Sequence, residues 1–132
     1  MPELAVNFMG LELKNPLVIA SSECARHISQ LKRAEDCHAS AVILKAVLPP
    51  GACGLGEDMR LFADVKRGAL MGIAGATRIT TSQGVEIVKQ GKKETRLKIG
   101  VNIPLFRFED TELYLDFAKQ AEKAGADFVE LN

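Results

Sequence analysis

Tryptophan is absent from this sequence, and aromatic residues make up only 5% of it. A surface that stacks the bases of single-stranded nucleic acid is therefore poorly supported. Net charge is also lacking, because 17 Lys and Arg balance 17 Asp and Glu among 132 residues. No overall field draws the chain to nucleic acid or to an anionic membrane. The longest apolar run, from Ala39 to Leu48, is interrupted by Lys45 and is too short to span a bilayer. From these absences we predict that the chain has no nucleic-acid partner and no membrane partner.

Cysteine is scarce, and its number is odd: Cys24, Cys37 and Cys53. Without a signal peptide, this favours reduced thiols in the cytoplasm over a disulfide framework. Zinc binding by Cys24, His27, Cys37 and His38 is disfavoured, because a helix from His27 to Cys37 separates the two pairs by roughly 15 Å, whereas zinc ligands lie within about 2.3 Å of the ion. A site made by Cys24, His27 and Cys53 remains an alternative. We predict no metal site and thiols that are buried or incidental.

The overall composition of the sequence is typical of a single globular domain. Hydrophobic residues make up 47% and charged residues 26%, near the averages for folded domains. At the N-terminus, apolar and polar residues alternate over 6–8 and 11–13 around Met9-Gly10. Alternation on both sides of a two-residue turn with glycine predicts a β-hairpin.

Four apolar segments downstream have the length and composition of strands, and helical periodicity separates them. The predicted strands are Leu17–Ala20, Ala41–Lys45, Leu97–Ile103 and Phe128–Asn132. The predicted helices run from about Ala25 to His38, from Gln83 to Glu94, and from Asp110 or Thr111 to a left-handed C-cap at Gly125. His38 occupies the helix-ending position where glycine is usual, so we expect a left-handed backbone there. Residues 46–84 are rich in glycine and are predicted to be an excursion, because they far exceed an ordinary βα connection of about 2 to 6 residues.

Strands that alternate with helices predict parallel βα units. Each predicted strand ends in polar residues, and ligands of parallel α/β proteins bind at the carboxyl ends of the strands. The fold class we predict is α/β: the N-terminal half of a TIM (β/α)8 barrel preceded by a β-hairpin. Residues 1–132 are expected to form a single partial domain, which looks truncated.

Several segments together give a specific resemblance. The order VNFMGLELKNP, LVIAS, LKRAED, AVILK, KIGVN and EKAGADFVELN resembles the dihydroorotate dehydrogenase family of FMN-dependent TIM barrels, including its dihydropyrimidine dehydrogenase-like branch. The resemblance covers residues 4–45 and 97–132. It implies the N-terminal portion of an FMN-dependent oxidoreductase that acts on a dihydropyrimidine-like substrate in pyrimidine metabolism.

The resemblance assigns a role to five positions. Ala20 and Ser21 match the first-strand end whose backbone approaches the flavin. Lys45 matches the lysine beside the isoalloxazine and the substrate, while Asn102 and Asn132 match asparagines that bind flavin or substrate. A cation near the N1/O2 edge of a flavin stabilises its reduced anion, and asparagine supplies paired donors and acceptors. No catalytic residue is assigned, because the family's base and phosphate-binding loops correspond to segments beyond residue 132. We therefore expect the chain alone to bind FMN weakly, to be inactive, and to self-associate or pair with a C-terminal half.

Alternatives remain. A lysine at a strand end also fits a Schiff-base lyase or aldolase centred on Lys45, and it fits a lysine that merely extends to solvent. A non-catalytic half barrel that works only by association is the third possibility.

Overall fold

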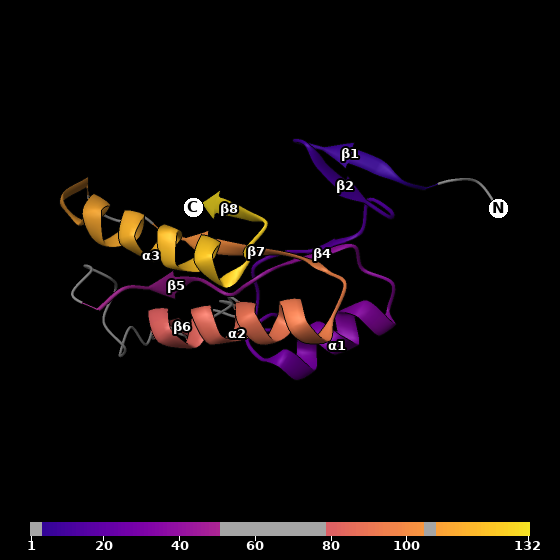
Figure 1. The fold of residues 1–132 in the computed structure, drawn as a ribbon, viewed down its shortest axis with the longest axis horizontal. Helices are drawn as coiled ribbons and strands as arrows, with labels where there is room; N and C mark the ends of the chain where they lie inside the picture. Colours follow the sequence, from indigo (N-terminus) through magenta and orange to yellow (C-terminus); the bar gives the residue numbers. More distant parts are fainter. Residues whose placement is uncertain (1–3, 51–78, 105–107) are drawn as a thin grey trace, which may run out of the picture.

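The computed structural model describes residues 4–50, 79–104 and 108–132, and its centre is a four-stranded parallel sheet in the order β3-β4-β7-β8 (Figure 1). The strands are β3 (Val18–Ile19), β4 (Ala41–Ile43), β7 (Lys98–Ile103) and β8 (Phe128–Leu131). Ile43 pairs with Gly100, and Gly100 pairs with Phe128 on its other side. The strands therefore lie side by side in chain order, which confirms the predicted parallel α/β arrangement.

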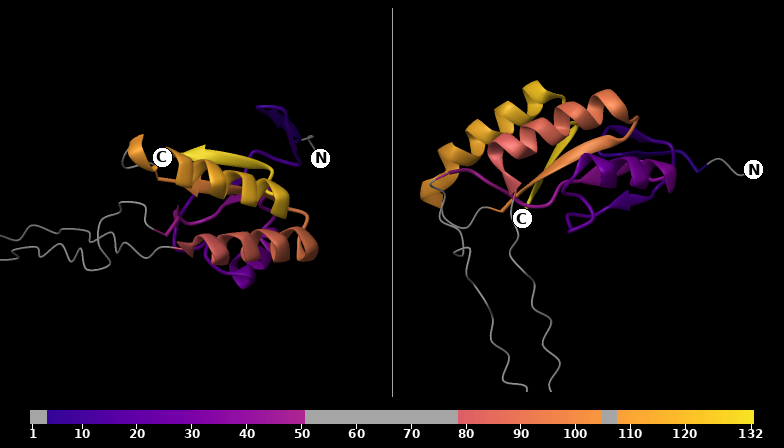
Figure 2. Two further views of the ribbon diagram at one scale, coloured as in Figure 1. Left: turned by 60° about the vertical axis from the view of Figure 1, so that its left-hand side comes forward. Right: turned by 90° about the horizontal axis from the view of Figure 1, so that it is seen from below.

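Helices connect the strands and cover one face of this sheet. They are α1 (Ile28–Asp36), α2 (Thr81–Glu94) and α3 (Thr111–Ala124), with a short 3-10 turn η2 (Phe108–Asp110) before α3. The right-hand view of Figure 2 shows α2 and α3 side by side above the strands, and α1 contacts α2. Parallel crossovers are nearly always right-handed, so a sheet that advances strand by strand in chain order places every helix on the same face.

Local sequence explains where the helices begin and end. Thr80 caps α2: its hydroxyl accepts from the backbone N–H of Gln83, whose side chain accepts from the backbone N–H of Thr80. Gly125 ends α3 with φ +100°. His38 follows α1 with φ 65°, which confirms the predicted left-handed turn at a non-glycine residue.

The core lies between the helices and alternate residues of the strands. Val42 and Leu44 near β4, and Ile99, Val101 and Ile103 on β7, are buried against the helices. Their partners include Leu31 of α1, Val88 of α2 and Phe117 of α3, all fully buried. Because successive strand residues point to opposite faces, the intervening residues point away from the helices.

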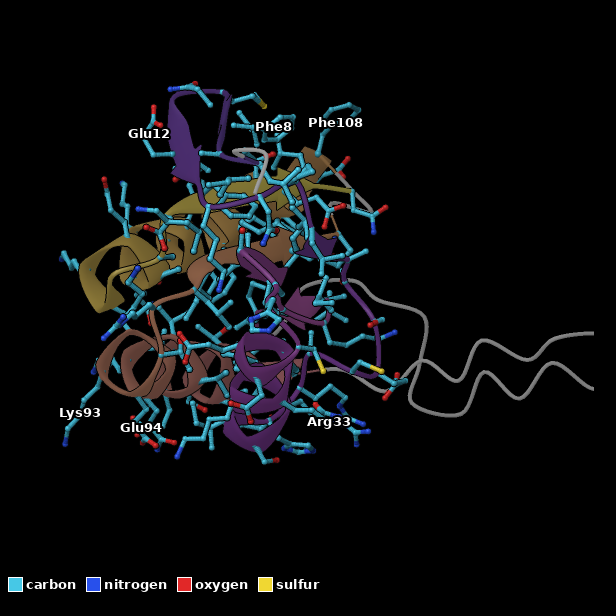
Figure 3. All side chains as sticks on the ribbon, turned by 90° about the vertical axis from the view of Figure 1, so that its right-hand side faces the viewer. Phe8, Glu12, Arg33, Lys93, Glu94 and Phe108 are labelled. Atoms are coloured by element: carbon cyan, nitrogen blue, oxygen red, sulfur yellow. The ribbon has the colours of Figure 1, made fainter. Side chains whose placement is uncertain are left out.

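The predicted hairpin is present as β1 (Val6–Phe8) and β2 (Leu11–Leu13), joined by Met9 and Gly10 at φ 51° and 84°. Two successive positive φ values are typical of the tight turn that matches strand twist. The hairpin lies on the side of the sheet away from α1 and α2, as Figures 1 and 3 show; Figure 3 labels its Phe8 and Glu12. Asn15 connects the segment that follows the hairpin to the turn before β4. Its side chain donates to the carbonyl of His38 (2.9 Å) and accepts from the Ser40 hydroxyl (2.9 Å).

A charged cluster fixes the amino-terminal end of β7 and β8. Asp127 accepts from Lys92 Nζ (2.8 Å) and from the backbone N–H of Ile99 (2.8 Å), and its other oxygen lies 3.4 Å from Lys98 Nζ. Burial raises the pKa of the Asp127 carboxyl, but these hydrogen bonds and the two ammonium charges outweigh burial, so the pKa lies below its ordinary value. This cluster ties α2 to the sheet at the end opposite the predicted site.

The main difference from the sequence prediction concerns the excursion predicted for residues 46–84. Its two ends form a parallel pair, β5 (Val47–Leu48) and β6 (Ile79–Thr80), and α2 begins at Thr81. Residues 51–78 of the excursion lie outside the described residues. The first predicted strand is also shorter, since only Val18 and Ile19 pair with β4. None of the helices in the described part of the chain combines the length and the apolar composition that a membrane-spanning segment requires.

Candidate functional site

The register places Asn102, one of the predicted site residues, on the face of the sheet that is free of helices. Ile43 and Gly100 are paired and point away from the helices. Two residues further along the chain, Asn102 has the same parity as Gly100 and lies near the carboxyl end of β7, while Lys45 follows the carboxyl end of β4. Glu130 of β8 is paired with Asn102 and shares this face. We call this region, defined by Lys45, Asn102 and Glu130, the carboxyl-end face.

Lys45 is held in an ion pair. Its ammonium lies 3.3 Å from Glu23 Oε1, and the other oxygen of Glu23 lies 3.1 Å from Arg26. The Lys45 side chain is 23% exposed, so the ammonium is partly withdrawn from water without being enclosed. One carboxylate thus anchors two cations, and Lys45 is oriented rather than extended into solvent.

The loop that supplies Glu23 is itself fixed by hydrogen bonds. The Gln30 side chain accepts from the backbone N–H of Arg26 (2.7 Å) and of His27 (3.0 Å), and donates to the carbonyl of Glu23 (2.7 Å). The backbone N–H of Lys45 donates to the carbonyl of Ala25 at 2.9 Å. The segment after β3 is therefore bound both to α1 and to the chain after β4, which holds Glu23 next to Lys45.

Asn102 is fully buried and only partly satisfied. Its Nδ2 donates to Glu130 Oε2 at 2.7 Å, a short bond to a charged acceptor. Its Oδ1 has no hydrogen-bond partner among the described residues. A buried acceptor without a donor costs about 1–3 kcal/mol, so this oxygen is a candidate for binding a donor group of a ligand.

The other predicted residues are less constrained. Ala20 is exposed directly after β3, and Ser21 beside it is half-buried. Asn132 is exposed, but its backbone N–H donates to the carbonyl of Ile103 at 3.0 Å, which extends the β7–β8 ladder to that residue. The structure thus brings Lys45 and Asn102 to neighbouring strand ends. Within the described ranges, the Ala20 and Asn132 side chains make no interaction that defines a site.

Two charged residues of this region were not identified from the sequence. Glu130 lies between Phe128 and Asn132, and strand alternation alone places it on the same face as Asn132. That signal was available. Glu23 lies in the loop after β3, and no local periodicity indicates that its carboxylate reaches Lys45, which is distant in sequence.

A cavity of about 340 Å³ lies where this loop approaches α2. It is lined by residues just before α1, on β6 and in the first turns of α2: Arg26, His27, Ile79, Ser82, Gln83, Glu86 and Ile87. Neither Lys45 nor Asn102 lines it, so it is distinct from the carboxyl-end face.

Metal ligation is not indicated by the geometry of the described residues, where no three His, Cys, Asp or Glu side chains are grouped to hold an ion. Cys24 and Cys37 are free and exposed. Cys53, which belongs to the alternative zinc site, lies outside the described residues.

Comparison with known proteins adds no family assignment: no family model matches the chain, and a search of curated proteins gives no significant match. The resemblance to dihydroorotate dehydrogenases stays a prediction that depends on the residues quoted above.

Proposed function

We propose that this chain forms the N-terminal half of a TIM barrel and is the N-terminal portion of an FMN-dependent oxidoreductase that acts on a dihydropyrimidine-like substrate. The observation that supports this best is the placement of Lys45 and the unsatisfied Asn102 at the carboxyl ends of neighbouring strands of a parallel sheet, with Asn102 on the face that is free of helices. That is where ligands bind in parallel α/β folds.

The strand order supports the barrel. In a doubly wound sheet the order reverses and helices cover both faces. Here the order β3-β4-β7-β8 never reverses, and α1, α2 and α3 lie on one face. In a barrel the other face becomes the interior. Its residues in this chain, such as Ala41, Ile43 and Phe128, are of the apolar kind that fills a barrel.

The residues of the carboxyl-end face suit a flavin. A bound FMN would supply the chemistry that accepts and returns a hydride. Lys45 would present its ammonium to the flavin or the substrate, and Asn102 Oδ1 would accept a hydrogen bond from a ring N–H. Ala20 and Ser21 would border the flavin through their backbone, and Asn132 would bind the flavin or the substrate.

The sheet edges support the proposed partner, which is a second copy of the chain or a C-terminal half. Among the described strands, β3 and β8 each have one neighbour in the sheet. On β8, Val129 is 41% exposed and Leu131 is 79% exposed. Unprotected strand edges with apolar side chains favour addition of another strand.

A flavin titration of Lys45 variants tests the proposal. FMN fluorescence is titrated with the wild-type chain, with Lys45→Met, and with Lys89→Met, which removes an exposed ammonium from α2. We expect weak but saturable binding by the wild type and by Lys89→Met. Lys45→Met should bind roughly tenfold to a hundredfold more weakly, because one interaction with a charged donor is lost. Absence of saturable binding, or equal affinity of Lys45→Met, would overturn the proposal.

A further inference from the structure

The hydrogen bond between Asn102 and Glu130 selects which end of the Asn102 amide is available to a ligand. An amide side chain can turn its oxygen or its NH2 group toward a given neighbour. An ionised carboxylate only accepts hydrogen bonds, so Glu130 binds the NH2 group, with Nδ2 to Oε2 at 2.7 Å. The opposite end, Oδ1, is then turned away from Glu130.

That oxygen is buried and has no partner among the described residues, although the Asn102 side chain is fully enclosed. A reversed amide would place NH2 at this position and would set the Asn102 oxygen against the Glu130 carboxylate, with two acceptors facing each other. The pair therefore has one stable arrangement. A ligand group that contacts Oδ1 must therefore donate a hydrogen bond.

We propose that Glu130 is a positioning residue that orients Asn102, so that the carboxyl-end face recognises an N–H donor on its ligand and disfavours ligands that offer only an acceptor at this point. This inference deepens the proposed function and rests on it. In an oxidised isoalloxazine the only ring N–H is N3–H. A flavin would therefore meet Asn102 through that group, and a flavin methylated at N3 would bind more weakly.

The first test needs no ligand. The side-chain amide resonances of Asn102 are compared by ¹H–¹⁵N NMR in the wild-type chain, in Glu130→Gln, and in Glu122→Gln, which removes an exposed carboxylate from α3. We expect Glu130→Gln to shift both side-chain amide proton resonances of Asn102 and to lower the protection of these protons from exchange. The backbone spectrum should remain that of the folded chain. Glu122→Gln should leave the Asn102 resonances in place. Unchanged Asn102 resonances in Glu130→Gln would overturn the inference whether or not a flavin binds.

The second test uses lumiflavin and 3-methyllumiflavin as probes. The wild-type chain should bind lumiflavin at least about tenfold more tightly than it binds 3-methyllumiflavin, because the methylated ligand leaves the buried Oδ1 without a donor. In Glu130→Gln the preference should fall to within about threefold, since glutamine can donate to Asn102 and release its amide to turn. Equal binding of both probes by the wild type would contradict the inference while leaving the proposed flavin function intact. Failure of both probes to bind would contradict the proposed function and the N3–H assignment, while the Asn102 resonances would still decide the orientation.

Discussion

At the residue scale, similar side chains have different roles at the two ends of the sheet. Lys92 and Lys98 surround Asp127 at the amino-terminal end, where the ion pairs join helix to strand. Lys45 lies at the carboxyl end and shares Glu23 with Arg26. We assign the first group to stability and the second to ligand binding, because ligands of parallel sheets bind at the carboxyl ends of strands.

The Asp127 cluster gives a stability prediction. Asp127→Ala should lower the free energy of unfolding at pH 7 by about 2–3 kcal/mol, since the side chain is only 13% exposed and accepts from a charged and a backbone donor. Asp116→Ala, at an exposed site on α3, should change it by less than about 0.5 kcal/mol. Urea denaturation followed by circular dichroism measures both, and equal effects would contradict the assignment.

The same carboxylate gives a pH dependence. Its pKa is lower in the folded chain than in the unfolded chain, so its contribution is fully present above the unfolded value of about 4. The contribution declines as the pH falls through the folded pKa. The stability difference between wild type and Asp127→Ala should therefore be constant from pH 5 to pH 7 and shrink below about pH 4. A difference that does not change on acidification would show that the carboxylate charge is irrelevant.

Lys45 separates the two enzyme hypotheses. Schiff-base chemistry needs a neutral, nucleophilic amine, whereas the ion pair with Glu23 is an interaction of the charged ammonium. Borohydride treatment in the presence of pyruvate or another small carbonyl compound should therefore leave Lys45 unmodified, as measured by peptide mass spectrometry. A reduced adduct at Lys45 would favour the lyase hypothesis over the flavin hypothesis.

At the scale of elements, close packing between helix and sheet depends on one glycine of α2. A Cβ built on Gly91 lies 2.5 Å from Ile99 Cδ1 and 2.9 Å from Leu31 Cδ2, and both of those residues are fully buried. Gly91→Val should destabilise the chain by about 1–3 kcal/mol through overpacking. Lys93→Val lies on the exposed surface of the same helix. It places a β-branched residue in the helix, as Gly91→Val does, but it does not crowd the core, so its effect should be smaller. Thermal unfolding of both variants measures the difference, and similar losses would contradict the packing argument.

Sequence periodicity predicted the elements that have a strong local signal. The stripe of Tyr114, Phe117 and Ala121 with Gly125 defined α3, and Met9-Gly10 defined the hairpin turn. The β5–β6 pair was missed because each strand has two residues, and the pairing joins segments about 30 residues apart with no local pattern. Lys45 and Asn102 were predictable from strand ends, whereas the contact between Lys45 and Glu23 depends on how the loop after β3 folds back.

At the scale of the whole molecule, the sheet has an edge strand at each end and leaves the apolar Leu131 exposed. We expect the isolated chain to self-associate at micromolar concentration, because such edges favour pairing with another strand. Leu131→Lys should shift the chain toward monomer, whereas Met9→Lys, which changes an exposed residue on the hairpin, should not. Sedimentation velocity measures this, and a stable wild-type monomer would contradict the expectation.

The central claim is that the carboxyl-end face of this sheet binds a flavin. Backbone ¹H–¹⁵N spectra of the labelled chain titrated with FMN test it most directly, because they report both binding and its location. The account predicts saturable shifts concentrated at Ala20, Ser21, Lys45, Asn102 and Glu130, with the Asp127 region unchanged. Saturable shifts confined to another region, such as the cavity between α1 and α2, or no shifts at any FMN concentration, would contradict it.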